Sequence, residues 1–332
     1  MKKKIIPVFF LLSLLFIFSC SNEKGSLPAS SGKTAEILFI IDKNHWEGIL
    51  GDSIRNIFMA EYQILNQPEP LFSLAHIEES AFSKIFEPFR NIIIIEIKPE
   101  HSKAKFEVRK NVWAQPQLVF KLSANKISDL ITLLSAQKEE IIKMVYENER
   151  TRMINSFKRD EDIKISNQLR DKFGFSLIIP KGYFTAKITD DFCWLRRETE
   201  ETSMGILIYT YLYTDTISFN KDYILNLRDS LTKVNIPGPS EGSYMQISRK
   251  VILPVEKKLS FKNMFAVETR GLWEVEGDFM GGPFINYTFV DENKNKVITL
   301  DGFVYAPRFD KRDYVIQLES LIHTFEMKKP IL

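Results

Sequence analysis

The chain has 332 residues, of which 44% are hydrophobic and 27% are charged. This composition excludes a disordered chain, a collagen-like repeat and a polytopic membrane protein, and the length predicts two domains. Three of the 45 basic residues lie in the first nineteen positions; without them 42 basic residues face 43 acidic ones, a net charge of about −1. The rest of the chain has no basic run or basic face, so we expect no nucleic-acid partner.

Residues 1–19 predict a signal peptide. A basic start, Met1 to Lys4, precedes an apolar core at residues 5–18 that is too short to span a bilayer well. The sequence Ile17-Phe18-Ser19-Cys20 resembles a bacterial lipobox, which implies cleavage before Cys20 and lipidation of its thiol. The alternative is an ordinary secretory signal followed by a chance cysteine. Residues 20–34 contain the lipidated cysteine and a Ser-, Gly- and Pro-rich stretch, which predicts a flexible tether.

A lipidated Cys20 predicts a lipoprotein of the cell envelope, because two or more acyl chains give a stable membrane anchor. No acidic residue directly follows Cys20, which resembles the outer-membrane address of a diderm bacterium. We therefore expect an outer-membrane protein that faces the periplasm or the cell surface. Acylation of Cys20 leaves Cys193 as the second and last cysteine, so the fold has no intramolecular disulfide. Its apolar neighbours predict that Cys193 is buried and structural.

Residues 35–160 predict a small α/β layer domain. The continuous apolar runs at 35–42 and 91–97 are typical of strands covered on both faces. Further strands are expected at 72–77, 104–109 and 117–122, with helices at 46–65 and 80–89. The longest helix is expected to start at a cap on Ser123 or Asn125 and to run to about Arg159. The mixed charges of residues 158–171 predict a connector between the domains.

Residues 161–332 predict an antiparallel sheet packed by helices, which places the chain in the α+β class. Helices are expected at 224–234 and from about Asp310, and a polar hairpin tip at 291–296. Strands are expected at 173–180, 183–188, 192–197, 204–214, 247–254, 264–274, 284–290 and 297–305. The opening Phe-Ser-Leu-Ile-Ile-Pro-Lys-Gly-Tyr at 175–183 and the closing strand and helix resemble the PsbP and Mog1-like sandwich fold.

Catalytic and cofactor motifs give little support for an enzyme. No two of the four histidines are three or four positions apart, so no helix can present a two-histidine metal site, and we expect no metal and no cofactor. His323 lies outside the apolar stripe of its helix and is expected to be solvated. Residues 238–242 match G-x-S-x-G at Ser240, but a helix precedes this serine and a strand follows it, the reverse of a nucleophile elbow. We therefore interpret this segment as a loop.

The most unusual segment, residues 271–284, contains four glycines, a proline and three aromatic residues. Such a composition predicts a chain path with backbone angles that other residues avoid. One interpretation is a ligand or partner site made of Trp273, Asp278, Phe279, Met280, Gly281 and Gly282, with Asp278 as its polar group. The other, which we favour, is a bulged crossover that packs against the final helix. A second candidate surface is the face shared by Tyr209, Tyr211 and Tyr213.

The same segment carries a resemblance to a family of bacterial lipoproteins, domain of unknown function 4837. The residues that carry it are Leu272-Trp273 and residues 278–284, together with residues 51–55 and 68–72 in the first half. This resemblance extends over nearly all of the mature chain. It implies a lipoprotein of the envelope and no particular activity.

Two functions are compatible with these observations. The one we expect is a non-enzymatic envelope module, tethered by Cys20, that binds an envelope protein or a small ligand. The alternative is a hydrolase that acts on an envelope polymer with paired carboxylates such as Glu274, Glu276 and Asp278. These acids would share one strand face, and glycoside hydrolysis requires two carboxyl groups about 5 to 10 Å apart across a cleft.

Overall fold

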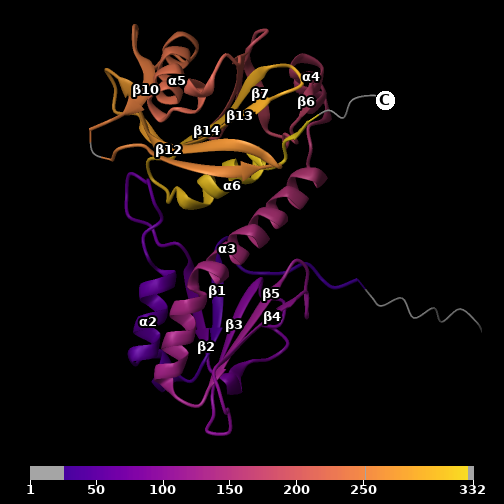
Figure 1. Cartoon of the computed structure of the whole chain (residues 1–332), viewed down its shortest axis with the longest axis vertical. Coiled ribbons are helices and arrows are strands. Elements are labelled where there is room, and N and C mark those ends of the chain that lie inside the picture. The colour runs from indigo at the N-terminus through magenta and orange to yellow at the C-terminus, as the bar shows by residue number, and fades with distance from the viewer. Residues whose placement is uncertain (1–25, 251, 328–332) are drawn as a thin grey trace, which may run out of the picture.

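A computed structural model describes residues 26–250 and 252–327. Figure 1 shows two layered domains joined by one long helix, α3 (Ile127–Arg159). The fold is α+β, as the sequence predicts. The expected signal peptide and Cys20 lie outside the described residues. Within the described ranges, no helix is both long enough and apolar enough to cross a membrane.

The first domain contains a five-stranded sheet with the order β2-β1-β3-β5-β4. Its strands are β1 (Glu36–Ile40), β2 (Ser73–Ile77), β3 (Asn91–Ile97), β4 (Lys105–Lys110) and β5 (Leu118–Ala124). All pairs are parallel except β4 with β5. All five strands were predicted, because long apolar, β-branched runs suit a sheet buried on both faces.

Helices cover one face of this sheet and loops cover the other. The helices are α1 (Lys43–Trp46), α2 (Ile49–Phe58) and the first half of α3, and η2 (Glu79–Ala81) is a single 3-10 turn. Ile54 and Leu134 pack with Phe39 on the helical face. On the other face, Phe89 and Trp113 pack over the buried Ile92, Ile40 and Val119. Residues 26–34, expected within the tether, lie along this domain, where the backbone N–H of Ser30 donates to the Gln115 carbonyl at 3.3 Å.

Four expectations for residues 46–171 were wrong at the level of single elements. The helix expected at 46–65 is interrupted at Gly48 and ends at Phe58, after which the Tyr62 N–H bonds to the Glu69 carbonyl and forms a loop. The helix expected at 80–89 is only the turn η2, because side-chain bonds from Gln117 hold the carbonyls of residues 87 and 89 in an irregular path.

The other two errors concern the ends of helices. Helix α3 has Lys126 at its N-cap position and no side-chain cap, and Ser123 belongs to β5. The expected connector at 158–171 is largely a helix, α4 (Ile163–Phe173). Asp162 caps it by accepting from the N–H groups of residues 164 and 165, and Gly174 ends it in the left-handed region at φ 78°.

The second domain contains an antiparallel sheet with the order β10-β12-β13-β14-β9-β8-β7, and β11 also pairs with β12. Its strands are β7 (Tyr183–Ile188), β8 (Phe192–Glu198), β9 (Ser203–Leu212), β10 (Tyr244–Ser248), β11 (Val255–Phe261), β12 (Met264–Glu276), β13 (Gly281–Asp291) and β14 (Lys296–Tyr305). A two-stranded sheet pairs β6 (Phe175–Ser176) with β15 (Glu326–Met327). The strand expected at 173–180 is therefore short. Strand β11 was not predicted; its first four residues are exposed and only Leu259 and Phe261 are covered.

Two helices pack on opposite faces of the second sheet (Figure 1). They are α5 (Lys221–Asn235), preceded by the turn η3 (Thr216–Phe219), and α6 (Arg312–Ile322). Helix α5 is held by Arg228, whose guanidinium donates from Nε to Asp301 on β14 at 2.8 Å; both side chains are fully buried. Asn286 also donates to this carboxylate, at 3.1 Å. The ion pair fixes where α5 lies on the sheet, because a buried charge needs its partner.

Helix α6 lies between the second sheet and the first domain, and its N-terminus is capped by the first domain. The carboxylate of Glu69 accepts from the backbone N–H groups of Lys311 and Arg312, at 2.6 and 2.8 Å. Arg312 in turn donates to the Pro70 carbonyl at 2.8 Å. A carboxylate at this place satisfies orphan N–H groups and complements the helix dipole. The Pro68-Glu69-Pro70 loop is therefore a docking element.

We expect Glu69→Ala to lower the free energy of unfolding by about 1–2 kcal/mol, because α6 loses its cap and the domains lose a contact. Chemical denaturation followed by circular dichroism measures this loss. The matched control is Glu61→Ala in the same loop, where the side chain is exposed. Equal stability of the two variants would show that the cap contributes nothing.

Candidate functional site

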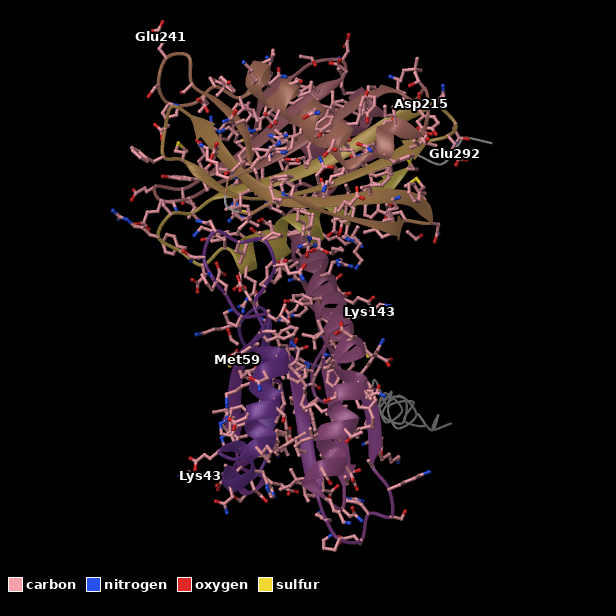
Figure 2. All side chains as sticks on the ribbon, turned by 60° about the vertical axis from the view of Figure 1, so that its left-hand side comes forward. Lys43, Met59, Lys143, Asp215, Glu241 and Glu292 are labelled. Atoms are coloured by element: carbon pink, nitrogen blue, oxygen red, sulfur yellow. The ribbon has the colours of Figure 1, made fainter. Side chains whose placement is uncertain are left out.

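The strongest candidate site is a cavity of about 350 Å³ on the α5 face of the second sheet. Helix α5 ends at Asn235, and Ile236 to Pro239 then turn away, so the sheet extends beyond the helix that covers it. Glu241 marks this loop at one end of the domain in Figure 2, far from Asp215 and Glu292 at the other end. The cavity lining comes from the loop and five strands: Trp194, Arg196, Ser203, Met245, Trp273, Val275, Met280, Phe303 and Tyr305.

Three glycines make room for the aromatic rings in and under this cavity. Each lies directly opposite an aromatic residue on the neighbouring strand: Gly205 opposite Phe303, Gly271 opposite Phe284, and Gly282 opposite Trp273. A Cβ atom would approach the Phe303 ring to 2.2 Å from Gly205 and the Phe284 ring to 2.5 Å from Gly271. The missing side chains let the rings lie across the strands, which produces a continuous aromatic floor.

Two hydrogen-bond donors in the cavity lining have no partner among the described residues. They are Nε1 of Trp194, a side chain that is 8% exposed, and Nε of Arg196. The Arg196 guanidinium carbon lies 4.8 Å from the Trp194 ring centroid, so both donors belong to one corner of the cavity. Burial lowers the pKa of Arg196. Its Nη2 forms an ion pair with Glu198, which leaves Nε free. Buried donors without acceptors are rare in native proteins.

The six predicted site residues lie in three places: in the cavity lining, behind that lining, and in the exposed hairpin turn. Trp273 and Met280 line the cavity, and Trp273 donates from Nε1 to the Val304 carbonyl at 3.2 Å. Gly282 lets the Val304 carbonyl come close, since a Cβ atom there would lie 2.0 Å from its oxygen, and Gly281 begins β13 opposite Glu274. Asp278 instead stabilises a tight turn by accepting from the Met280 N–H at 3.0 Å.

Phe279 projects into solvent from the tip of the β12–β13 hairpin and is completely exposed. The segment is thus a hairpin and not the crossover that we favoured, because Gly277 adopts φ 82° and reverses the chain between paired strands. Trp273 and Phe284 of this segment pack in the α5-face cluster with Phe303 and Leu207. They do not pack against the final helix, α6. The expectation of packing against that helix was therefore also wrong.

The tyrosine face of β9 is mostly covered. Tyr209 is buried and its hydroxyl accepts from Asn286 at 3.0 Å. The Tyr211 ring lies 6.2 Å from Tyr223, and the Tyr213 ring lies 6.1 Å from Phe219. This face therefore mainly packs against α5 and η3.

The carboxylates of the hydrolase alternative lie apart from the cavity. Glu274 and Glu276 alternate with Trp273 and Val275 along β12, so they point to the opposite face of the strand. Gln246 donates to both carboxylates, at 3.2 and 2.7 Å, and Lys250 pairs with Glu274 at 3.0 Å. Burial raises the pKa of Glu274, but the bonds to Lys250 and Gln246 lower it by more. The pKa therefore lies below its ordinary value. Such a carboxylate is suited to an ion pair and poorly suited to general acid catalysis at neutral pH.

Cys193 and Ser240, two further residues considered in the sequence, lie where the fold explains them without a catalytic role. Cys193 is buried, as predicted, and burial raises its pKa to about 12, so the thiol is not activated. Ser240 lies in the loop after α5, as predicted. No group of three or more His, Cys, Asp or Glu residues suited to a metal ion occurs in residues 26–250 and 252–327.

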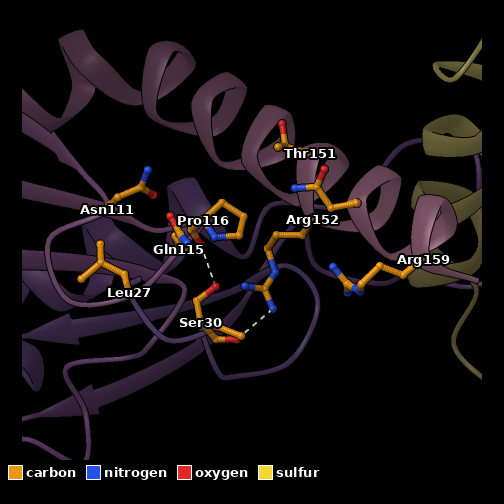
Figure 3. Close-up of a pocket in the computed structure, with 10 residues that line it drawn as sticks. Leu27, Ser30, Asn111, Gln115, Pro116, Thr151, Arg152 and Arg159 are labelled. Atoms are coloured by element: carbon orange, nitrogen blue, oxygen red, sulfur yellow. Dashed lines mark hydrogen bonds between the residues drawn. The ribbon is translucent and has the colours of Figure 1, made fainter. Parts of the chain in front are cut away.

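A second cavity, of about 560 Å³, lies beside the first described residues. Figure 3 shows Arg152 and Arg159 of α3 near Ser30 and the Gln115-Pro116 turn. Arg152 donates to the Ser30 carbonyl at 3.2 Å, and the Ser30 hydroxyl donates to the Pro116 carbonyl at 2.6 Å. These bonds attach the N-terminal segment to α3, which gives this cavity a structural explanation.

A third cavity, of about 510 Å³, lies between the domains over a buried ionic network. Arg270 donates to Glu268 at 2.6 Å and to Glu319 at 2.9 Å, and Arg150 of α3 donates to Glu319 at 2.8 Å. The Tyr62 hydroxyl of the first domain accepts from Arg270 at 3.0 Å. Burial alone would raise the pKa of Glu319, but Arg270 and Arg150 outweigh it and lower the pKa to about 2. The charges are paired, so the network is a domain contact.

His323 borders this network, and the expectation that it is solvated was wrong. Its ring lies 5.1 Å from the Phe261 ring and 5.6 Å from the Tyr287 ring. Burial, helped by the nearby charge of Arg150, lowers the pKa of His323 to about 3. The helical stripe missed this packing because His323 follows the end of α6, where the chain turns back toward the sheet.

Sequence reasoning missed Trp194, Arg196, Phe303 and Tyr305 as lining residues. Their strands were predicted, but no sequence distance indicates that residues of β8 and β14 line the same cavity as residues of β12. The signal that was available is the alternation of Trp194 with Arg196, which places an aromatic and a cation on one strand face.

Comparisons with known proteins divide the chain as the two sheets do. Residues 162–324 match the family described as Domain of unknown function (DUF4837). Residues 30–158 match a different family, Domain of unknown function (DUF8532), so the expected DUF4837 resemblance is confirmed for the second half only. The first-half segments 51–55 and 68–72 belong to the DUF8532 match. The sequence has no significant match among curated proteins.

Two of the solved structures to which this chain is similar have low scores. The Ran-binding protein Mog1p of Saccharomyces cerevisiae has 12% identity and a TM-score of 0.31, over 47% of this chain and 90% of Mog1p. LpqN of Mycobacterium tuberculosis, involved in cell envelope biogenesis, has 12% identity and a TM-score of 0.26, over 45% of this chain and 79% of LpqN. These TM-scores are too low to carry a statement about function.

We expect the stability of the protein to fall by about 2 kcal/mol between pH 6.5 and pH 5 through His323. The folded-state pKa of about 3 lies below the unfolded value of 6.5, so the unfolded chain takes up a proton that the folded chain excludes. This stability is complete above pH 6.5 and is lost as the pH falls toward 3; Glu319 adds a further loss below its unfolded pKa of 4.5.

Urea denaturation at several pH values measures this dependence. In the variant His323→Gln, the free energy of unfolding should no longer fall between pH 6.5 and pH 5. In His45→Gln, a matched control on α1, it should still fall. An unchanged pH dependence in His323→Gln would contradict the assignment.

Proposed function

We propose that this protein is a non-enzymatic binding module anchored in the cell envelope, and that its DUF4837 domain takes a small, largely apolar ligand in the cavity at the end of α5. The observation that carries the proposal is the aromatic cavity lined by Trp273, Phe303 and Met280. Its volume lies at the lower end of the range for ligand pockets, roughly 300–1,000 Å³. Envelope location is supported by the signal peptide and lipobox in the sequence.

A binding module is favoured over a hydrolase because the cavity lining contains no carboxylate. The acids nominated for hydrolysis face the other side of β12 and engage Gln246 and Lys250. An aromatic floor with a few polar groups at one corner is typical of ligand recognition. The position of Phe279 at the hairpin tip, next to Met280 of the lining, also leaves a large apolar side chain beside the cavity.

We expect a chain that lacks residues 1–20 to bind the neutral apolar dye N-phenyl-1-naphthylamine, with an increase in dye fluorescence. This chain retains every described residue. The variant Ser203→Phe should weaken binding at least tenfold, because the new ring fills the cavity from β9. The matched control, Ser135→Phe, adds the same ring to an exposed position on α3 and should bind like the parent. Equal dye binding by all three proteins would refute the cavity as the site.

The envelope anchor has its own test in the bacterial cell. We expect the full-length protein to incorporate a palmitate analogue and to fractionate with the outer membrane, and Cys20→Ala to lose the label. Labelling followed by membrane fractionation measures both properties, with Cys193→Ala as the matched cysteine control. Absence of label from the wild-type protein would overturn the lipoprotein assignment.

A further inference from the structure

The unpartnered donors of Trp194 and Arg196 indicate what the ligand carries. We propose that the cavity selects a small monocarboxylate with an apolar body, whose carboxylate accepts hydrogen bonds from Trp194 Nε1 and Arg196 Nε. This inference rests on the proposed function and adds to it the chemical class of the ligand.

The two donors occupy one corner of the cavity. Both side chains come from β8, two residues apart, and therefore point to the same face of the sheet. Arg196 lies opposite Gly205 on β9, and Gly205 lies opposite Phe303 on β14. Because Gly205 has no side chain, nothing separates the guanidinium from the aromatic floor on this row of the sheet. Both nitrogens have almost no accessible surface in this arrangement, so a ligand on the floor reaches them when the partly exposed Arg196 side chain turns aside from the Trp194 ring.

The donors require an acceptor that the described part of the protein does not supply. A buried N–H without an acceptor destabilises the protein, so a ligand that supplies an acceptor recovers this free energy. The Nη2 of Arg196 is held by Glu198, which orients the guanidinium and leaves Nε available. An indole N–H and a guanidinium N–H are donors only, so the complementary group must accept both bonds.

A carboxylate satisfies these requirements better than a neutral group does. It has two oxygens and accepts without donating, and its negative charge interacts with the guanidinium in a partly desolvated corner. The rest of the cavity offers rings and aliphatic groups from Trp273, Phe303, Met280 and Val275. An aliphatic chain and an aromatic ring would both fit this chemistry, so the test includes one acid of each kind.

Two acids and their neutral amides provide the test on the chain that lacks residues 1–20. Octanoate and 3-phenylpropanoate are compared with octanamide and 3-phenylpropanamide by calorimetry or by the fluorescence of Trp194 and Trp273. We expect at least one acid to bind tenfold or more tightly than its amide, because a charge-assisted hydrogen bond is roughly twice as strong as a neutral one. Equal affinity of both acids and their amides would overturn the proposal.

Variants assign the preference to the two donors. Trp194→Phe keeps a ring and removes the N–H, and Arg196→Gln removes the guanidinium; each should weaken the preferred acid about tenfold and leave its amide nearly unchanged. The matched controls are Trp113→Phe in the first domain and Arg308→Gln, an exposed arginine. A thermal midpoint within a few degrees of the parent shows that Trp194→Phe is folded. Full acid affinity in both cavity variants would overturn the assignment.

The dye experiment separates failure of this inference from failure of the proposed function. If N-phenyl-1-naphthylamine binds and Ser203→Phe abolishes its binding, the cavity is a site whatever the acids do. Dye binding without any preference for an acid refutes the carboxylate alone. Loss of both dye and acid binding refutes the site itself.

Discussion

The position of α6 between the two domains is the constraint on which the arrangement of the whole molecule depends. Its N–H groups are capped by Glu69 of the first domain, and its Glu319 joins Arg270 of the second sheet to Arg150 of α3. Buried charges that have lost a partner cost several kcal/mol, so these contacts hold only when both domains are in place. The two domains are therefore docked through paired polar groups in addition to apolar packing.

The cavity follows from a second constraint, the point where α5 ends. Arg228 fixes α5 over Asp301 near the centre of the sheet, and the helix stops at Asn235. Strands β8, β9, β10, β12 and β14 contribute side chains to the cavity beyond the end of this helix. Trp273 and Phe303 form a floor because the facing strands have glycine at the matching positions. A ligand site thus arises where a long sheet meets a shorter helix.

Burial and neighbouring charges together set the ionisation states of Glu319 and His323. Glu319 is held ionised by two arginines, and His323 is held neutral by burial and by the same positive charge. Both belong to the domain contact, and neither faces the aromatic cavity. The cavity instead combines apolar groups with two donors that find no acceptor in the described part of the chain, which is an environment for recognition and not for proton transfer.

The sequence by itself determined the α+β class, the five strands of the first sheet and most strands of the second, because apolar periodicity records which faces are buried. It also singled out Trp273, Met280 and Gly282, whose residue types are rare together. Tertiary structure alone decided that residues 271–284 form a hairpin on the α5 face, that Asp278 stabilises a turn, and that Trp194 and Arg196 join the site. Pairing register and helix placement depend on contacts between residues far apart in the chain, and local sequence does not encode them.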